Sequence, residues 1–206
     1  MYPLSKAIFD NTVFNHIARI QSADMYIIFQ SLLQEVLVPQ TVVAEMEDWE
    51  QDPLFAARIG YFTSQIRRNQ FYKFCTSYNP IILEEAQRYI DKGEADAVAQ
   101  SDRTGVLVFI TDDKLCQGHI RAEYPNIRIH SIYFLIVLAY LQNLLPNAEE
   151  VLQEFHQLMY VKKMKRTTQR KYREMLRKET IEALKVLGFP HDKRQISFLT
   201  SLKNII

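Results

Sequence analysis

The sequence has little of several features that would assign it to a specialised class of protein. Its 206 residues carry 25 Lys and Arg against 24 Asp and Glu, and this net charge of +1 excludes a globally basic nucleic-acid coat and a globally acidic tail. The two cysteines, Cys75 and Cys116, lack the C-x-x-C spacing of a metal site. Internal repeats and low-complexity segments are absent as well. What remains is an ordinary globular composition, with 48% hydrophobic and 24% charged residues.

Signals for export and for membrane insertion are also missing from the sequence. The first residues show no basic region followed by an apolar stretch and a cleavage site. The most apolar run, Ile132 to Leu141, is too short to span a bilayer, which takes roughly 20 residues, and predicts a buried helix. Two thiols in a chain without export features indicate a reducing compartment. We therefore expect a cytoplasmic protein with no membrane partner.

Short apolar runs alternate with helical patterns through the first two thirds of the chain. Strands are predicted at 7–9, 36–38, 106–110 and 127–129, and helices at about 12–20, 41–49, 56–66, 81–91, 94–102 and from 132 onwards. Gly93 is placed to end the helix at 81–91, and Thr41 is placed to cap the helix at 41–49. This alternation predicts an α/β fold with a parallel sheet covered by helices on both faces.

The last part of the chain has a different composition. After Pro146 the sequence turns to polar helix without a further strand signal, and 167–187 forms an amphipathic pattern that Gly188 and Pro190 end. We predict two parts, a domain at 1–145 and a helical, basic extension at 146–206. This extension could be an arm that binds the phosphates of a nucleic acid, or a solvated helix face whose apolar side docks on the domain. Its basic residues include Lys162, Lys163, Lys165, Arg166, Arg170, Lys171 and Arg173.

Carboxylates follow the predicted strands at the positions where an active site would form. In an open parallel sheet, ligands bind beyond the carboxyl ends of the strands. Asp10 directly follows the first strand, and Asp112 and Asp113 directly follow the strand at 106–110. Glu45 lies about one helical turn after the second strand. Asp96 can reach the same edge if its helix starts above that edge, so the sequence predicts one pocket with four carboxylates.

A pocket of this kind is unfavourable without a counter-charge. Two like charges about 4 Å apart repel by roughly 4 kcal/mol at an effective dielectric of 20. Either some of the acids keep protons or a divalent cation lies among them. Oxygen-only ligands select Mg²⁺ or Mn²⁺, and such ions serve phosphodiester hydrolysis by activating water and stabilising charge on the phosphate. Taken singly, each acid could instead cap a helix or lie on a solvated surface.

Four segments of the sequence resemble the PIN-domain family, in particular the VapC-like toxin ribonucleases. They are FDNTVF with Asp10, VPQTVVAEME with Glu45, GEADAVAQ with Asp96 and VFITDDK with Asp113, in the family's order over about residues 5–140. The resemblance implies a parallel sheet sandwiched by helices. It also implies an endoribonuclease selective for single strands, with these four acids as catalytic ligands of Mg²⁺ or Mn²⁺.

The resemblance extends to further polar residues around the four acids. Glu94 belongs to a GEA-plus-acid variant of the third motif and could contact a second metal ion. Asp112 could replace Asp113 as the fourth ligand, since the two are neighbours in the sequence. Supporting positions beside the acids would be Asn11, Thr12 and Thr111.

Three hypotheses of function follow from these residues. The leading one is a metal-dependent ribonuclease, with the toxin of a toxin–antitoxin pair as its specific form, RNA as substrate, an antitoxin protein as partner and a homodimer as its assembly. The second is a non-catalytic PIN-like module that binds RNA or a protein partner. The third is a nuclease for DNA or for structured nucleic acid that uses the same acids. His16 and His119 are expected in packing or surface roles, because the acids already complete the site.

Overall fold

The computed structural model describes residues 4–49, 53, 56–68, 71–159 and 166–188, which fall into two compact units. Residues 4–18 and 33–130 form the first, here called the sheet unit. Residues 19–32 and the described residues from 131 onwards form the second, the helical unit. The boundary that we predicted at residue 145 lies inside the helical unit. As a division into independent domains it stays a prediction.

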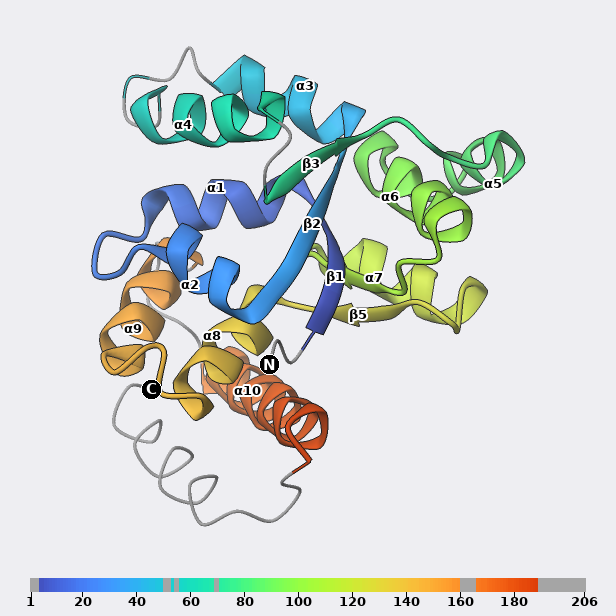
Figure 1. The fold of residues 1–206 in the computed structure, drawn as a ribbon. Coiled ribbons are helices and arrows are strands. Elements are labelled where there is room, and N and C mark those ends of the chain that lie inside the picture. Colours follow the sequence, from blue (N-terminus) through green and yellow to red (C-terminus); the bar gives the residue numbers. More distant parts are fainter. Residues whose placement is uncertain (1–3, 50–52, 54–55, 69–70, 160–165, 189–206) are drawn as a thin grey trace. The chain divides into compact units, whose positions relative to one another are not determined.

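The sheet unit is built on five parallel strands in the order β3–β2–β1–β4–β5 (Figure 1). They are β1 (Leu4–Phe9), β2 (Leu33–Pro39), β3 (Tyr72–Cys75), β4 (Val108–Ile110) and β5 (Arg128–His130). In the register, Ile8 of the central strand β1 lies beside Leu37 of β2 and Phe109 of β4. The predicted parallel sheet is confirmed, with one strand more than predicted. Strand β3 was missed because its four residues, YKFC, form no continuous apolar run.

Helices cover both faces of this sheet. They are α1 (Asn11–Arg19), α3 (Gln40–Trp49), α4 (Ala56–Arg67), α5 (Pro80–Ala86), α6 (Lys92–Thr104) and α7 (Lys114–Glu123). Figure 1 shows α1 and α4 on one side of β1 and β2, and α6 and α7 on the other. Successive side chains of a strand point to opposite faces. Strand β1 therefore contributes to two separate apolar layers.

The two apolar layers differ in the side chains that fill them. On the side of α1, the ring of Phe14 lies 5.9 Å from that of Phe9 and 5.4 Å from that of Tyr72, measured between centroids. On the side of α6 and α7, Ile8 belongs to a buried cluster with Val98 and Ile120. Because helices cover β1 on both faces, Asp10, the residue that follows its carboxyl end, is buried as well.

The segment that leads into α6 differs from the prediction. Helix α5 ends at Ala86 rather than near Asp91, and Gly93 lies inside the first turn of α6 instead of ending a helix. Gly105, with a left-handed φ of 71°, ends α6 at its other side. Thr41 is likewise inside α3 and not its cap, since α3 begins at Gln40. The turn at 87–91 breaks the helical pattern that the sequence had suggested.

The helical unit contains α2 (Met25–Leu32), α8 (Ile132–Leu141), α9 (Ala148–Met159) and α10 (Arg166–Val186). Helix α8 packs against the other three, and all its residues except Tyr140 are buried. The ring of Tyr133 on α8 lies 4.6 Å from that of Phe155 on α9, between centroids. The prediction that the apolar run at 132–141 is a buried helix is therefore confirmed.

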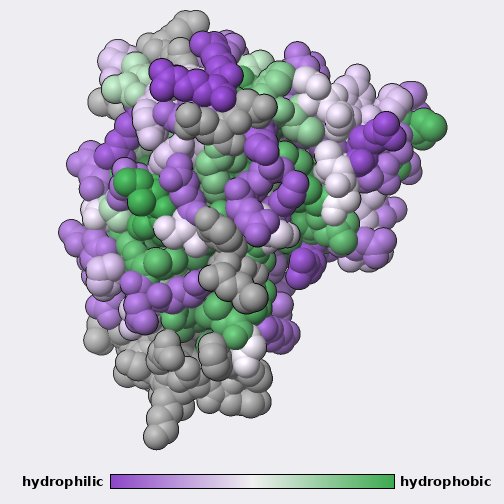
Figure 2. Space-filling model, in the orientation of Figure 1, coloured by the Kyte–Doolittle hydropathy of each residue, from purple (hydrophilic) through white to green (hydrophobic). Residues whose placement is uncertain are grey.

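The surface has the mixed character that the composition suggests. Figure 2 shows hydrophilic residues over much of the visible surface, with hydrophobic residues between them. Among the described helices, none combines the length and the apolar composition needed to cross a membrane.

Candidate active site

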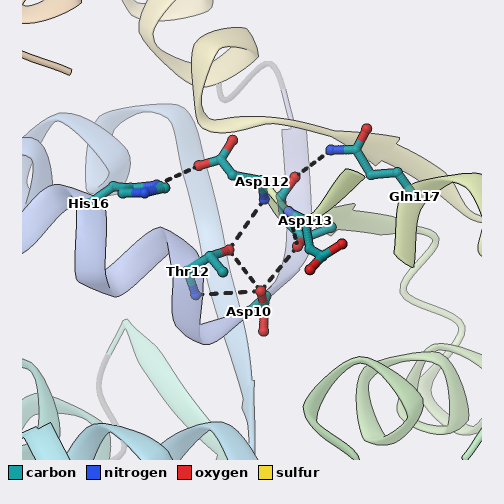
Figure 3. Close-up of polar contacts among 7 residues, drawn as sticks. Asp10, Thr12, His16, Asp112, Asp113 and Gln117 are labelled. Carbon is teal, nitrogen blue, oxygen red and sulfur yellow. Dashed lines mark hydrogen bonds and ion pairs between the residues drawn. The ribbon is translucent and has the colours of Figure 1, made fainter. Parts of the chain in front are cut away.

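Asp10 lies at the carboxyl end of the central strand and is the most buried acid of the predicted set, with 1% of its surface exposed. Its backbone N–H donates to the carbonyl of Ile110 on the neighbouring strand at 3.1 Å. Its Oδ2 atom accepts from the hydroxyls of Thr12 (2.7 Å) and Thr111 (3.0 Å), and from the Thr12 N–H (3.4 Å) (Figure 3). The carboxylate is therefore fixed through one of its two oxygens.

The two hydroxyls are oriented by the loop between β4 and α7. The Asp112 N–H donates to Thr12 Oγ1 at 3.2 Å, and the Asp113 N–H donates to Thr111 Oγ1 at 3.1 Å. Each hydroxyl accepts from a backbone N–H, so its single proton is directed to Asp10. Burial raises the pKa of Asp10, while the hydrogen bonds from Thr12 and Thr111 lower it. Thr12 and Thr111, which the sequence suggested as supporting residues, therefore both contact Asp10.

Glu45 lies on α3, the helix that follows β2, and β2 is the strand beside β1. Its carboxylate faces that of Asp10. Burial raises the pKa of Glu45, and the negative charge of Asp10 raises it further. The side-chain amide of Asn11 donates to Oε2 of Glu45, so this residue also lies beside the acids. Asn11 thus joins the start of α1 to the helix that carries Glu45.

Gly93 provides the space in which two of these carboxylates meet. A Cβ atom at this position would lie 3.4 Å from Oε1 of Glu45 and 3.8 Å from Oδ1 of Asp10. The oxygen of Asp10 on this side is not the one that binds the two threonine hydroxyls. The missing side chain of Gly93 therefore leaves a small cradle between the carboxylates.

Glu94 is a second buried acid whose protonation is affected by this environment. Only 6% of its surface is exposed. Burial, followed by the charges of Asp10, Asp91 and Asp113, raises the pKa of Glu94 to about 7. A carboxyl group that titrates near neutrality is typical of functional sites in which like charges are held together. The electrostatics thus connect Glu94 to Asp10 and to Asp113.

The neighbouring acids Asp112 and Asp113 have different surroundings. Asp113 caps α7, because its Oδ1 accepts from the N–H groups of Leu115 (2.7 Å) and Cys116 (3.0 Å). Its negative charge contributes to the raised pKa of Glu94. Asp112 instead points to α1, where its Oδ2 lies 2.8 Å from Nδ1 of His16 (Figure 3). The two aspartates, of which the sequence favoured Asp113 as the fourth ligand with Asp112 as the alternative, thus have different partners.

Asp96 forms hydrogen bonds with two neutral side chains. Its Oδ2 accepts from the hydroxyl of Thr41 at 2.9 Å, and its Oδ1 accepts from Nε2 of Gln100 at 3.1 Å. Glu94 and Asp96 are two residues apart on one helix, about 200° around its axis, so they face different directions. Asp96 therefore connects α6 to the first turn of α3, which is the helix that carries Glu45.

Electrostatic repulsion links four of these carboxylates, because Asp10 acts on Glu45 and Glu94, and Asp113 acts on Glu94. We call Asp10, Glu45, Glu94 and Asp113 the acid group. In the described part of the chain, no three Asp, Glu, His or Cys side chains lie close enough together to hold a metal ion as they stand. Lys162, Lys163 and Lys165 lie outside the described residues, as do the side chains of Arg166, Arg170, Lys171 and Arg173.

Two contributors to this site were not singled out from the sequence. Asp91 precedes α6 and raises the pKa of both Glu45 and Glu94, although its own side chain makes no capping hydrogen bond to the helix. Its place two residues before GEAD was a visible signal. The role of Gly93 had no such signal, because a glycine before a helical pattern equally suggests the end of the preceding helix.

An acid group at the carboxyl edge of a five-stranded parallel sheet, with helices on both faces, defines an α/β protein with a PIN-like fold. A family model described as a PIN domain matches residues 6–180, and the chain belongs to this family. Both the family and the fold predicted from the sequence are thereby confirmed. PIN domains are generally nucleases and typically use divalent metal ions. The match includes the basic residues of α10 up to residue 180. No curated protein matches the chain significantly.

Proposed function

We propose that this protein is a metal-dependent endoribonuclease that hydrolyses phosphodiester bonds in single-stranded RNA. The observation that carries the proposal is the placement of Asp10, buried at the sheet edge with Glu45 and Glu94 in electrostatic contact. Burial raises the pKa values of Asp10, Glu45 and Glu94, and the repulsion between these acids raises the pKa values of Glu45 and Glu94 further. A divalent cation is the ligand that such a group is best suited to accept.

The residues present fit Mg²⁺ or Mn²⁺. Their donors are carboxylate oxygens alone, which hard cations prefer. The cradle above Gly93 has Glu45 Oε1 and Asp10 Oδ1 at its border, both turned to the same space. We expect Asp10, Glu45, Glu94 and Asp113 to hold the ion, directly or through water. When bound, the ion supplies an activated water and stabilises charge on the phosphate.

The chain's own residues prepare the site for this ligand. The two threonine hydroxyls occupy Oδ2 of Asp10 and so orient its Oδ1 to the cradle. Glu94 provides a carboxyl group that holds a proton near neutrality and releases it when positive charge arrives. The cap that Asp113 makes with α7 fixes the position of its carboxylate relative to Thr111.

We propose Glu94, rather than Asp96, as the third acid of the metal site. Glu94 is in electrostatic contact with Asp10 and Asp113, whereas Asp96 is occupied by Thr41 and Gln100. Asp96 would then support the site by holding α3 against α6. Glu94→Gln is expected to abolish Mn²⁺ binding, and Asp96→Asn to weaken it by a smaller factor. Calorimetry on both variants decides the assignment, and the reverse order of effects would restore Asp96.

Cleavage of labelled single-stranded RNA with Mg²⁺ or Mn²⁺ tests the activity itself. Wild-type protein is expected to cleave, and Asp10→Asn to lose the activity. Glu84→Gln is the matched control, because Glu84 is exposed on α5 and forms an ion pair with Arg88 in the turn that follows this helix. Equal cleavage by all three proteins would indicate a contaminant. Absence of both cleavage and Mn²⁺ binding in wild type would favour the non-catalytic RNA-binding or partner-binding module.

The choice of RNA rests on the likeness of the four motifs to VapC-like ribonucleases and on the basic residues of the C-terminal part. A substrate panel of single-stranded RNA, duplex RNA and single-stranded DNA tests it. Preferential cleavage of single-stranded DNA or of duplex RNA would instead indicate a different class of nuclease that uses the same acids. A role as a toxin, an antitoxin partner, a homodimer and a cytoplasmic location stay predictions. A small adjacent gene for a DNA-binding protein would support the first two.

A further inference from the structure

We propose that His16 is a positioning residue of the acid group, which binds Asp112 and thereby leaves Asp113 as the aspartate that serves the site. His16 lies on α1, one helical turn after Thr12, so both side chains project from the same face of that helix. One of them reaches Asp10 and the other reaches Asp112. Helix α1 therefore holds the loop between β4 and α7 at two points.

The first point of attachment is the backbone of the loop. The Asp112 N–H donates to Thr12 Oγ1 at 3.2 Å, and the same hydroxyl donates to Asp10 at 2.7 Å. The second is the side chain, where Nδ1 of His16 lies 2.8 Å from Oδ2 of Asp112. A carboxylate accepts hydrogen bonds only, so Nδ1 is the donor. Both contacts are drawn in Figure 3.

Burial makes the His16 contact significant for the position of the loop. The side chain of Asp112 is 4% exposed and that of His16 is 14% exposed. A carboxylate enclosed in this way is costly unless it is paired. Its pairing with His16 fixes the direction of residue 112 toward α1. Asp113 follows in extended backbone, with φ −73° and ψ 115°, and consecutive side chains in extended backbone point to opposite sides.

The consequence is that the pair determines which of two adjacent aspartates is available. With Asp112 held by His16, Asp113 is turned to α7, where it caps the helix and acts on Glu94. Without His16, Asp112 would lose the hydrogen bond that directs it toward α1, and the segment from Thr111 to Asp113 would move. That segment supplies both a hydroxyl to Asp10 and a member of the acid group.

Hydrogen exchange tests the positioning role without any metal. Amide groups in the first turn of a helix have no partner within the helix, so Leu115 and Cys116 are protected by Asp113. In His16→Ala these two amides are expected to exchange faster. Asn79 protects the amides of Ile81 and Ile82 on α5 in the same way, and these are the internal control. His16→Gln, which keeps a donor, is expected to restore the protection.

Binding of Mn²⁺, measured by calorimetry, tests the consequence for the site and rests on the proposed function. His16→Ala is expected to raise the dissociation constant about 10- to 100-fold, as is typical when a residue that orients a ligand is lost. Asp112→Asn keeps an acceptor for His16 and should bind nearly as wild type, whereas Asp113→Asn should not bind.

The outcomes that overturn the inference are distinct from those that overturn the proposed function. Unchanged exchange of Leu115 and Cys116 in His16→Ala refutes the positioning role, whether or not metal binds. Loss of Mn²⁺ binding in Asp112→Asn to the same extent as in Asp113→Asn also refutes it. Wild-type protein that binds no Mn²⁺ refutes the proposed metal site, and the exchange measurement then still decides on His16.

Discussion

Replacement of Glu94 by Gln should stabilise the metal-free protein at neutral pH while it removes function. In the folded protein the pKa of Glu94 is raised from 4.5 to about 7. A carboxyl group with a raised pKa favours folding at low pH, and this contribution is lost as pH rises from the unfolded value through the folded one. Glutamine carries no charge at any pH. The difference between variant and wild type should therefore be small at pH 5 and large at pH 8.

The magnitude follows from the shift in pKa. Each unit of pKa difference corresponds to about 1.4 kcal/mol, so at pH 8 the expected gain in the free energy of unfolding is about 3 kcal/mol. Neighbouring acids such as Asp10 share the proton, which reduces the measured gain to about 2 to 3 kcal/mol. For a chain of this length, a gain of that size raises the midpoint of thermal unfolding by roughly 4 to 12 °C.

The assay is chemical and thermal unfolding in a chelator at about pH 5 and about pH 8. Glu84→Gln on the exposed face of α5 is the control and should show no comparable gain at either pH. Mg²⁺ at 100 times its dissociation constant should then stabilise wild type by about 2.7 kcal/mol, and should leave Glu94→Gln unchanged. If the variant is no more stable than wild type at the higher pH, the reasoning from burial and repulsion at Glu94 is wrong.

Three further substitutions test separate parts of the structure. Thr111→Val removes the hydroxyl that joins Asp113 to Asp10 and should destabilise the protein by about 1 to 3 kcal/mol in urea unfolding, whereas Thr111→Ser should not. Gly93→Ala should stabilise α6 by up to about 1 kcal/mol yet weaken Mn²⁺ binding in calorimetry, because its methyl group fills the cradle. A loss on both measures would contradict this account. Phe14→Ala removes a buried ring between α1 and the sheet and should cost about 3 to 5 kcal/mol of stability, with Mn²⁺ affinity of the folded protein retained.

The sequence by itself determined the class of fold and the edge of the sheet at which the site lies. Apolar runs with β-branched and aromatic residues, alternating with helical periods, are local patterns, and they predicted the parallel sheet. Asp10 directly follows β1 and Asp113 lies in the short segment after β4, and all parallel strands end at the same side, so both could be placed at that edge. Strand β3 and the turn at 87–91 were missed, because short or polar segments carry weak local signals.

Only the tertiary structure decided which partner each individual acid contacts. Glu94 and Asp96 have the same chemistry and lie two residues apart on α6, and the packing of this helix on the sheet determines which of them faces Asp10. Asp112 and Asp113 are likewise equivalent in sequence until His16, 96 residues before Asp112, binds one of them. Contacts between residues far apart in the chain depend on how helices pack. Local sequence patterns predict each helix, but they do not fix which side chain of a helix meets a distant partner.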